Sequence, residues 1–306
     1  MGKTAFIFPG QGAQYCGMGK DFYESFEAAR KLYTIAEEAT GLDVKKLCFE
    51  KDDRLDITEY TQIAMLATEV AILKVMEEQG FRADCAAGLS LGEYGALAAA
   101  EVMELPQLFR LIRCRGIYMQ EAYPTGGAMT AVLGLDAETV GRICEETSGI
   151  VSIANDNCPG QIVITGEAEA VETASAKLAE AGAKRCVPLK VSGPFHSCLL
   201  AGAGEKLAAQ LEEVAVKEPK IPYICNAEAV YVRESAPIKK LLAMQVSGTV
   251  RWRETMELMI ANGVDTFIEI GPGKTLAGFL KRISRDVKVV SVGTVQELEA
   301  AKSLLS

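Results

Sequence analysis

A Gly-x-Ser-x-Gly pattern stands at Gly88-Leu89-Ser90-Leu91-Gly92. A short apolar run, residues 85–87, precedes it, and a helix-forming run, residues 94–101, follows it. Strand, sharp turn and helix are the setting of a nucleophile elbow, in which the serine side chain projects from the edge of a sheet. The backbone N–H of Leu91 opens the helix and is placed to donate to a developing oxyanion. Ordinary strand-to-helix turns also contain serine, so the rest of the chain has to distinguish the two.

Composition limits the class of protein. The 306 residues, 49% of them hydrophobic, suffice for one large domain or two modest ones with a sizeable core. The net charge of −9 argues against a nucleic-acid partner. No apolar run reaches about 18 residues, and the N-terminus lacks the apolar segment of a signal peptide, so we expect no membrane span and a cytoplasmic protein.

The cysteines and histidine bear on redox and metal chemistry. The nine cysteines include no Cys-x-x-Cys pair, which favours reduced thiols over disulfides or a metal site. A histidine-based metal cluster is excluded because the chain has one histidine, His196. That residue follows a Gly-Pro turn and precedes an Ala/Leu-rich helix, 199–214. If Ser90 is a nucleophile assisted by an imidazole, His196 is the only candidate base.

The remaining pattern is α/β. Continuous apolar runs at 4–8 and 264–270 predict buried parallel strands, with a further strand at 288–292. Helices are expected at 22–40, 61–79, 105–121 and 275–283, among others. The first strand runs into Pro9-Gly10-Gln11-Gly12, where backbone amides can approach a ligand; the Lys-Ser/Thr of a phosphate loop is missing. The turn at 271–274, Gly-Pro-Gly-Lys, is either an anion site at a helix start or a tight turn closing the sheet.

Shorter units fill residues 125–191. We expect strands at 128–133, 150–154, 160–165 and 185–189, and helices at 136–147 and 167–181. This β-α-β-β-α-β order is that of a ferredoxin-like unit. The predicted fold is therefore a large α/β-hydrolase-like domain with a parallel sheet, residues 1–124 and 192–306, and a small inserted ferredoxin-like (α+β) domain, residues 125–191.

Arg115 is an anomaly in the helix at 105–121. At 3.6 residues per turn it falls in the middle of the apolar face formed by Leu108, Leu111, Ile112 and Met119. A buried, unpaired charge is very costly, so Arg115 needs acidic or other acceptor groups. Either an internal Asp or Glu supplies them, or the carboxylate of a bound substrate does, gripped by the guanidinium fork.

These features together resemble a known family over nearly the whole chain and in the right order. The matching blocks are Phe8-Pro9-Gly10-Gln11-Gly12, Gly88 to Tyr94, Arg115-Gly116 with Met119 to Ala122, Asn157 to Gln161, Pro194-Phe195-His196-Ser197, and Glu269 with Gly271 to Lys274. The chain resembles malonyl-CoA:acyl carrier protein transacylases. The resemblance implies that Ser90 attacks the malonyl thioester and that His196 accepts its proton and later acts on the thiols.

The resemblance also implies the supporting groups. The backbone carbonyl of Gln245 would orient the imidazole, the amides of Gln11 and Leu91 would form the oxyanion hole, and Arg115 would hold the malonyl carboxylate. The acyl group would pass to the phosphopantetheine thiol of acyl carrier protein in a ping-pong cycle, for fatty acid or polyketide synthesis. No metal or redox cofactor is implied, and we expect a monomer.

One position departs from the family pattern, and two other functions stay open. Leu89 stands where the family commonly has His; that His is not the base, so activity should survive. A serine esterase, thioesterase or acyl hydrolase would share the elbow, although it needs no buried Arg115. A non-catalytic scaffold is the other alternative.

Because acyl carrier proteins are usually acidic, exposed basic residues are candidates for docking: Lys184, Arg185, Lys190, Lys281, Arg282 and Arg285.

Overall fold

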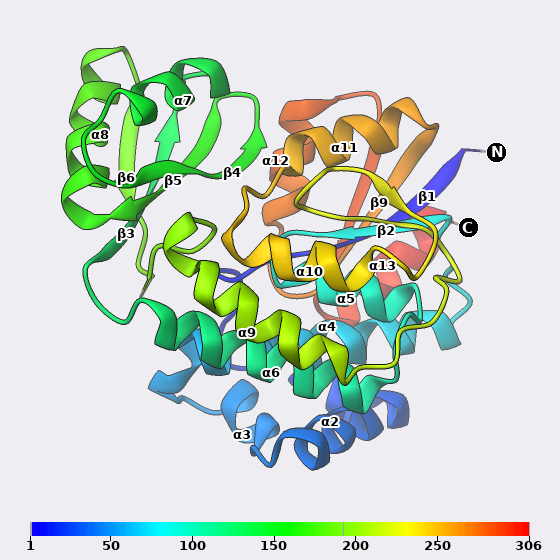
Figure 1. Cartoon of the computed structure of the whole chain (residues 1–306). Helices are drawn as coiled ribbons and strands as arrows, with labels where there is room; N and C mark the ends of the chain where they lie inside the picture. The colour runs from blue at the N-terminus through cyan, green and yellow to red at the C-terminus, as the bar shows by residue number, and fades with distance from the viewer. Residues whose placement is uncertain (1, 192, 306) are drawn as a thin grey trace.

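Two β-sheets organise the computed structural model, which describes residues 2–191 and 193–305 (Figure 1). The larger sheet has the strand order β10-β9-β1-β2-β7-β8, and its pairings are parallel except for β7 with β8. Its strands are β1 (Lys3–Phe8), β2 (Cys85–Gly88), β7 (Tyr223–Ile224), β8 (Tyr231–Val232), β9 (Val264–Ile270) and β10 (Lys288–Val292).

The centre of this sheet positions the elbow. Strand β1 is apolar and buried from Ala5 to Phe8, as expected for a strand covered on both faces. Its pairing with β2 places Phe8 opposite Gly88, and the N–H of Leu89 donates to the Phe8 carbonyl at 3.0 Å. The loop after β1 and the turn after β2 therefore meet at the carboxyl edge of the sheet, where open α/β sheets bind their ligands.

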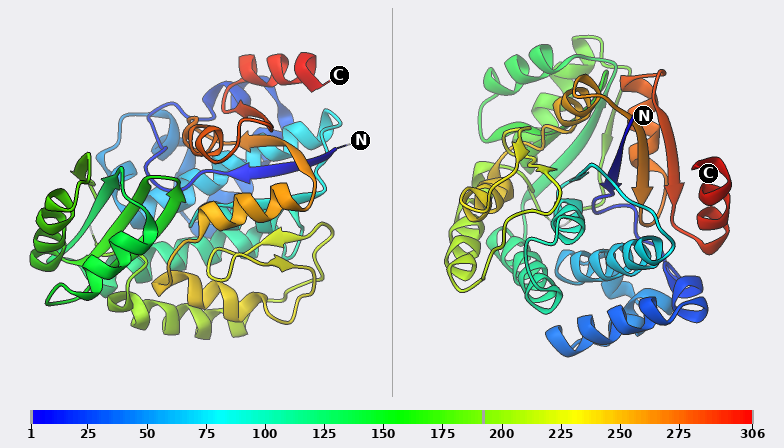
Figure 2. Two further views of the ribbon diagram at one scale, coloured as in Figure 1. Left: turned by 90° about the horizontal axis from the view of Figure 1, so that it is seen from above. Right: turned by 90° about the vertical axis from the view of Figure 1, so that its right-hand side faces the viewer.

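Helices cover both faces of the large sheet, and β1 begins on the same side of the molecule as α13 ends (Figures 1 and 2). Helix α4 lies in the interior and is buried around most of its circumference. The helical segments are α1 (Lys20–Ser25), α2 (Glu27–Thr40), α3 (Val44–Phe49), η1 (Asp53–Asp56), α4 (Thr58–Glu78), α5 (Gly92–Ala99), α6 (Leu105–Ala122), η2 (Cys198–Leu200), α9 (Ala201–Glu212), α10 (Ile238–Ser247), α11 (Trp252–Ala261), α12 (Thr275–Ile283) and α13 (Val295–Leu305).

The second sheet is antiparallel, with the order β4-β5-β3-β6. It consists of β3 (Gly127–Leu133), β4 (Val151–Cys158), β5 (Gln161–Glu167) and β6 (Arg185–Pro188), and α7 (Ala137–Glu145) and α8 (Ala168–Glu180) pack on it (Figure 1). This is the predicted β-α-β-β-α-β order, and the two-sheet fold class is confirmed. The domain boundaries at 124/125 and 191/192 stay a prediction, and Ser192 lies outside the described residues.

Strand β4 ties the second sheet to the rest of the chain. The N–H of Val250 donates to the Ala154 carbonyl at 2.8 Å, and the N–H of Asp156 donates to the Val250 carbonyl at 3.1 Å. Arg253 also pairs with the Asp156 carboxylate at 3.0 Å. These contacts hold the edge of the small sheet beside residues 248–251, the segment between α10 and α11. The carbonyl of Gly248 in this segment lies in the candidate active site.

The predicted helix at 22–40 is wrong in one respect. Phe26 has extended backbone (φ −127°, ψ 133°) and divides the segment into α1 and α2. The sequence offers no Gly or Pro at this break, and the aromatic ring of Phe26 packs 5.9 Å from that of Phe22. Tertiary packing therefore overrides a continuous helical pattern here.

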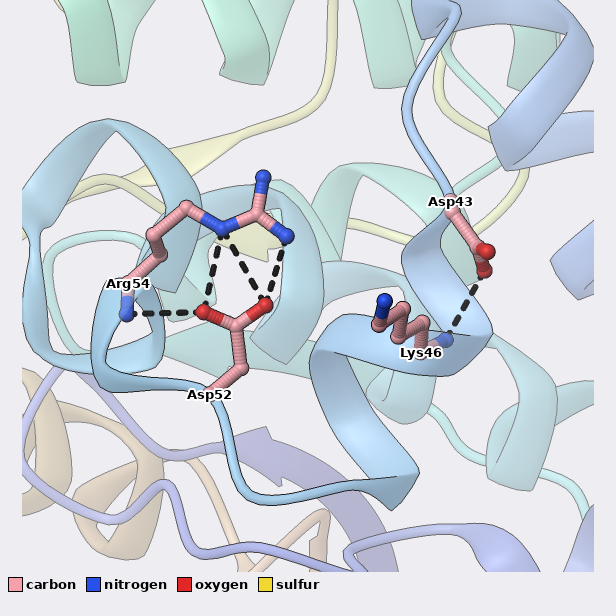
Figure 3. A network of polar contacts seen from close by, with 4 residues as sticks. All are labelled: Asp43, Lys46, Asp52 and Arg54. Atoms are coloured by element: carbon pink, nitrogen blue, oxygen red, sulfur yellow. Dashed lines mark hydrogen bonds and ion pairs between the residues drawn. The ribbon is translucent and has the colours of Figure 1, made fainter.

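Two short helical segments after α2 were not expected. The Asp43 side chain accepts a hydrogen bond from the N–H of Lys46 and caps α3 (Figure 3). Asp52 accepts from the N–H of Arg54 and also holds its guanidinium, with an Nη2 to Oδ2 distance of 2.5 Å (Figure 3). Aspartates at such positions satisfy free amides of a first turn and so stabilise both segments as helices.

The Gly-Pro-Gly-Lys turn closes the sheet and is not an open anion site. The Glu269 carboxylate accepts from the N–H groups of Leu276 and Ala277, each at 3.0 Å, so these first-turn amides of α12 are already bonded. Lys274 pairs with Glu297 at 2.6 Å. The interpretation of 271–274 as a structural turn is the one that the structure supports.

All nine cysteines are free thiols, as the sequence predicts. Cys16 and Cys198 are exposed, whereas the others are buried or half-buried. Among the described residues, no helix combines the length and apolar character needed to cross a membrane.

A buried carboxyl on α4 leads to a prediction about stability. Glu69 is 0% exposed, and neither carboxylate oxygen has a hydrogen-bond partner among the described residues. Burial raises the pKa of Glu69 well above its ordinary value. The folded state thus keeps a proton that the unfolded chain releases, and the free energy of unfolding falls as pH rises from the unfolded pKa towards the folded one.

Glu69→Met is therefore expected to stabilise the fold by about 2–4 kcal/mol at pH 8, since methionine fills the space without a polar group. The gain should shrink as pH falls below about 4, the pKa of a glutamate in the unfolded chain, because the carboxyl is then protonated in both states. Urea unfolding at the two pH values measures it. A gain that is independent of pH would contradict the linkage.

Candidate active site

Ser90 occupies a sharp turn between β2 and α5, with a left-handed backbone (φ 56°) that serine rarely adopts. The flanking glycines make the turn possible. A Cβ on Gly88 would lie 1.8 Å from the carbonyl oxygen of Gly92, and one on Gly92 would lie 2.3 Å from that of Phe8. The Gly-x-Ser-x-Gly stretch thus has the strand–turn–helix geometry of a nucleophile elbow.

The side chain of Asn226 holds this turn in place. The sequence did not predict this role. Asn226 Oδ1 accepts from the N–H of Ser90 at 2.6 Å, and its Nδ2 donates to the Gly88 carbonyl at 2.7 Å. Asn226 follows β7, the neighbour of β2 in the sheet. A polar residue at the carboxyl end of an apolar strand was the available signal.

His196 lies directly against the serine. Its Nε2 is 2.7 Å from Ser90 Oγ, and its Nδ1 is 2.9 Å from the Gln245 carbonyl oxygen and 3.2 Å from that of Gly248. Carbonyls only accept hydrogen bonds, so Nδ1 carries the proton and the lone pair of Nε2 faces the serine hydroxyl. Burial, aided by the positive charge of Arg115, lowers the pKa of His196 to about 4. The imidazole is therefore neutral near pH 7, the form that accepts a proton.

Arg115 reaches the same point from α6 and is 1% exposed. Its Nη1 donates to Gln62 Oε1 at 2.6 Å, and its Nη2 donates to Gln245 Oε1 at 2.8 Å and to Ser90 Oγ at 3.2 Å. No carboxylate among the described residues lies within 4.0 Å of the guanidinium, so the internal ion pair that the sequence left open is not formed there. Neutral amides hold the cation in place without neutralising it.

The two amides expected to form an oxyanion hole are also at the site. Gln11 and Leu91 both line the pocket around Ser90, and within the described chain neither backbone N–H donates a hydrogen bond. The side chain of Gln11 is held away, with Nε2 donating to Thr58 Oγ1 at 3.1 Å. Two unengaged N–H groups beside a nucleophile are the donors that a tetrahedral oxyanion requires.

A cavity of about 270 Å³ contains these groups. The segments around the large sheet contribute the elbow, Gln11, Arg115 and His196 to its lining. The second sheet contributes Asn155, Asn157 and Gln161. Leu89, at the position of the family's usual histidine, lines the cavity and packs against Gly10. Further apolar walls come from Met119, Met129, Ala131, Val163, Leu189, Val191, Phe195, Leu276 and Phe279.

The residues brought together are those that the sequence singled out: Ser90, His196, Arg115, Gln11, Leu91 and the backbone of Gln245. Asn226, Gln62, Glu93 and the side chain of Gln245 complete the arrangement and were not predicted to do so. A serine activated by a neutral imidazole on an α/β fold of this kind defines, by class, an enzyme that transfers acyl groups through a serine ester.

Comparison with known proteins narrows the class. The acyl transferase domain family matches residues 5–301. A malonyl CoA-acyl carrier protein transacylase from Bacillus subtilis (strain 168) is 45% identical, with 98% of this chain and 96% of that protein covered. The crystal structure of an acyl-carrier-protein-S-malonyltransferase from Bartonella henselae has a TM-score of 0.96 at 45% identity, over 100% of this chain and 99% of that one.

A further similar structure contains a partner. It is a type II PKS acyl-carrier protein in complex with its malonyl-transacylase, with a TM-score of 0.96, 40% identity and 99% of both chains covered. The present chain belongs to the malonyl CoA-acyl carrier protein transacylase family.

Proposed function

We propose that this protein transfers the malonyl group of malonyl-CoA to the phosphopantetheine thiol of acyl carrier protein, through a malonyl ester of Ser90, in fatty acid or polyketide synthesis. The observation that carries the proposal is the buried Arg115 guanidinium, which lies 3.2 Å from Ser90 Oγ and has no carboxylate partner within residues 2–191 and 193–305. In a malonyl ester only a carbonyl carbon and a methylene separate the serine oxygen from the carboxylate, which therefore reaches this cation. The names of the relatives agree with this substrate and this partner.

The first half-reaction loads the serine. His196 Nε2 accepts the proton of Ser90 Oγ as that oxygen attacks the malonyl thioester carbonyl. The backbone N–H groups of Gln11 and Leu91 donate to the oxyanion that forms. The tetrahedral intermediate collapses, the C–S bond breaks, and the imidazolium returns its proton to the leaving CoA thiolate.

The second half-reaction runs these steps with another thiol. His196 takes the proton of the phosphopantetheine thiol, the sulfur attacks the malonyl ester, and the released Ser90 oxygen regains a proton from the imidazolium. A thioester is consumed and a thioester is formed, so the exchange requires neither a metal nor a redox cofactor. We further propose that the protein is a cytoplasmic monomer.

The acidic carrier protein is proposed to dock on basic residues around the pocket mouth. Lys190 lies between the pocket residues Leu189 and Val191, and Arg282 donates to Gln161 Oε1 at 2.8 Å. All six basic candidates are exposed, namely Lys184, Arg185, Lys190, Lys281, Arg282 and Arg285. Because Arg282 is engaged with the β4–β5 connection, Lys190 and Lys281 are the better residues to test.

The double variant Lys190→Glu with Lys281→Glu is expected to raise the KM for acyl carrier protein by about tenfold and to leave acylation by malonyl-CoA unchanged. The effect should weaken at high salt. Steady-state transfer assays measure it. Lys31→Glu, on the exposed face of α2, is the control, and an equal change there or an unchanged KM would remove the docking proposal.

The proposed function is tested by intact-protein mass spectrometry after brief mixing with malonyl-CoA. Wild type should gain one malonyl group and Ser90→Ala none, and added holo-acyl carrier protein should remove the adduct and carry it. Release of free malonate without acylated carrier protein would indicate a hydrolase instead. Absence of any adduct and of any product would indicate a non-catalytic protein.

A further inference from the structure

Glu93 is a fully buried carboxyl in the first turn of α5, below the nucleophile. Its Oε2 accepts from the N–H of Asn226 at 3.0 Å and from Nε2 of Gln245 at 2.7 Å. Its Oε1 has no partner among the described residues. Burial raises the pKa of Glu93 to about 7, against the effect of these two hydrogen bonds. Retaining a carboxyl here is costly, and the mechanism above does not use it.

The hydrogen bond to Gln245 determines which way its amide points. Gln245 Nε2 donates to Glu93 Oε2 and also to the Ser90 carbonyl at 2.9 Å, so both amide hydrogens are used. The amide oxygen is thereby left to accept from Arg115 Nη2 at 2.8 Å. The reversed amide would set oxygen against two oxygens and its NH₂ against the guanidinium, and every one of those contacts is unfavourable.

Arg115 depends on that orientation. Its two terminal nitrogens are each held by an amide oxygen, Gln62 on one and Gln245 on the other, with Ser90 Oγ next to the second. We propose that Glu93 is a positioning residue for the acyl carboxylate: by fixing the Gln245 amide, it holds the Arg115 fork towards the substrate and so sets the preference for acyl groups that carry a carboxylate. This inference rests on the proposed function and names the determinant of its substrate preference.

A merely structural role makes a different prediction. Glu93 also bonds the backbone of Asn226, whose side chain supports the elbow, and disturbing the elbow would slow acylation by every thioester alike. A positioning role through Gln245 acts on Arg115 and lowers acylation by substrates with a carboxylate far more than acylation by substrates without one. The ratio of malonyl-CoA to acetyl-CoA acylation rates therefore separates the two roles.

The test compares Glu93→Met, which removes the acceptor, with Glu93→Gln, which keeps one acceptor oxygen. The matched control is Glu69→Met, because Glu69 is also fully buried and packs against α5 at Gly95. Acylation of Ser90 is followed by intact-protein mass spectrometry with each CoA ester. Glu93→Met should lower the malonyl-to-acetyl ratio by about 30-fold, Glu93→Gln should restore it to within about threefold of wild type, and Glu69→Met should leave it unchanged.

Gln245→Met provides a second, independent test, because it removes the side-chain amide and keeps the backbone carbonyl that bonds His196. If Glu93 acts through this amide, Glu93→Met added to Gln245→Met should change the ratio by less than about twofold. Equal losses with both CoA esters, or independent effects of the two substitutions, would overturn the proposal. A wild-type protein that forms no malonyl adduct would instead overturn the proposed function, which the same experiment reveals.

Discussion

His196→Ala is expected to lower the rate constant for malonyl-enzyme formation by about 10³-fold, the loss that follows removal of a well-placed general base. No other imidazole exists in the chain, and His196 Nε2 lies 2.7 Å from Ser90 Oγ. Single-turnover mass spectrometry with malonyl-CoA measures the rate, and thermal unfolding checks that the variant folds. Added imidazole should recover part of the rate, since it can enter the space that the side chain leaves. A rate within threefold of wild type would show that Ser90 is activated by some other group.

The pH dependence of the wild-type enzyme follows from the same residue. Only the neutral imidazole accepts a proton, and the pKa of His196 is lowered to about 4. The acylation rate should therefore retain its His196-dependent value from pH 8 down to about pH 5 and fall about tenfold per pH unit below pH 4. An inflection near pH 7 would belong to Glu93, and Glu93→Gln should abolish it while leaving the limb near pH 4. A fall in rate at the ordinary histidine pKa that persists in Glu93→Gln would contradict a buried, neutral base.

The sequence predicted those helices and strands whose ends are set by neighbouring residues in the chain. The strand 264–270, the helix 275–283 and the strand 288–292 coincide with β9, α12 and β10, because apolar runs there end at glycine turns or at charged residues. The break at Phe26 carries no such signal, since an extended residue between two helical runs is imposed by packing. Strand β7 is limited to Tyr223–Ile224 by tertiary contacts as well, since Asn226 lies beyond the strand and bonds the elbow.

Site residues were likewise predictable where a single residue is unusual in its own sequence context. A serine between glycines, a solitary histidine and an arginine on an apolar face each stand out without a partner. Asn226 and Gln245 do not, because they act on Ser90 from 136 and 155 residues away along the chain. Only the fold shows that the partners of Arg115 are amides. Its helix position alone left an internal ion pair and a substrate carboxylate as equal alternatives, and the family resemblance implied the carboxylate.

Arg115→Ala is expected to reduce acylation by malonyl-CoA by about 10²–10³-fold and to leave acylation by acetyl-CoA within about threefold of wild type. The substrate carboxylate would enter a buried pocket without its cation, and loss of one partner of such a pair costs about 3–4 kcal/mol. Arg115→Lys keeps the charge and loses the fork, so it should recover part of the malonyl rate only. Both rates are read in one mass-spectrometric time course.

The matched control for this prediction is Arg110→Ala, on the same helix but with an exposed side chain, and it should change neither rate. Parallel losses with both CoA esters in Arg115→Ala would mean that Arg115 supports the serine and not the carboxylate. Its 3.2 Å contact with Ser90 Oγ makes that a real alternative, and its two amide partners argue against it. Amides neutralise no charge, so the guanidinium still attracts an anion, and in this pocket an acyl group bearing a carboxylate is the anion that reaches both Arg115 and Ser90.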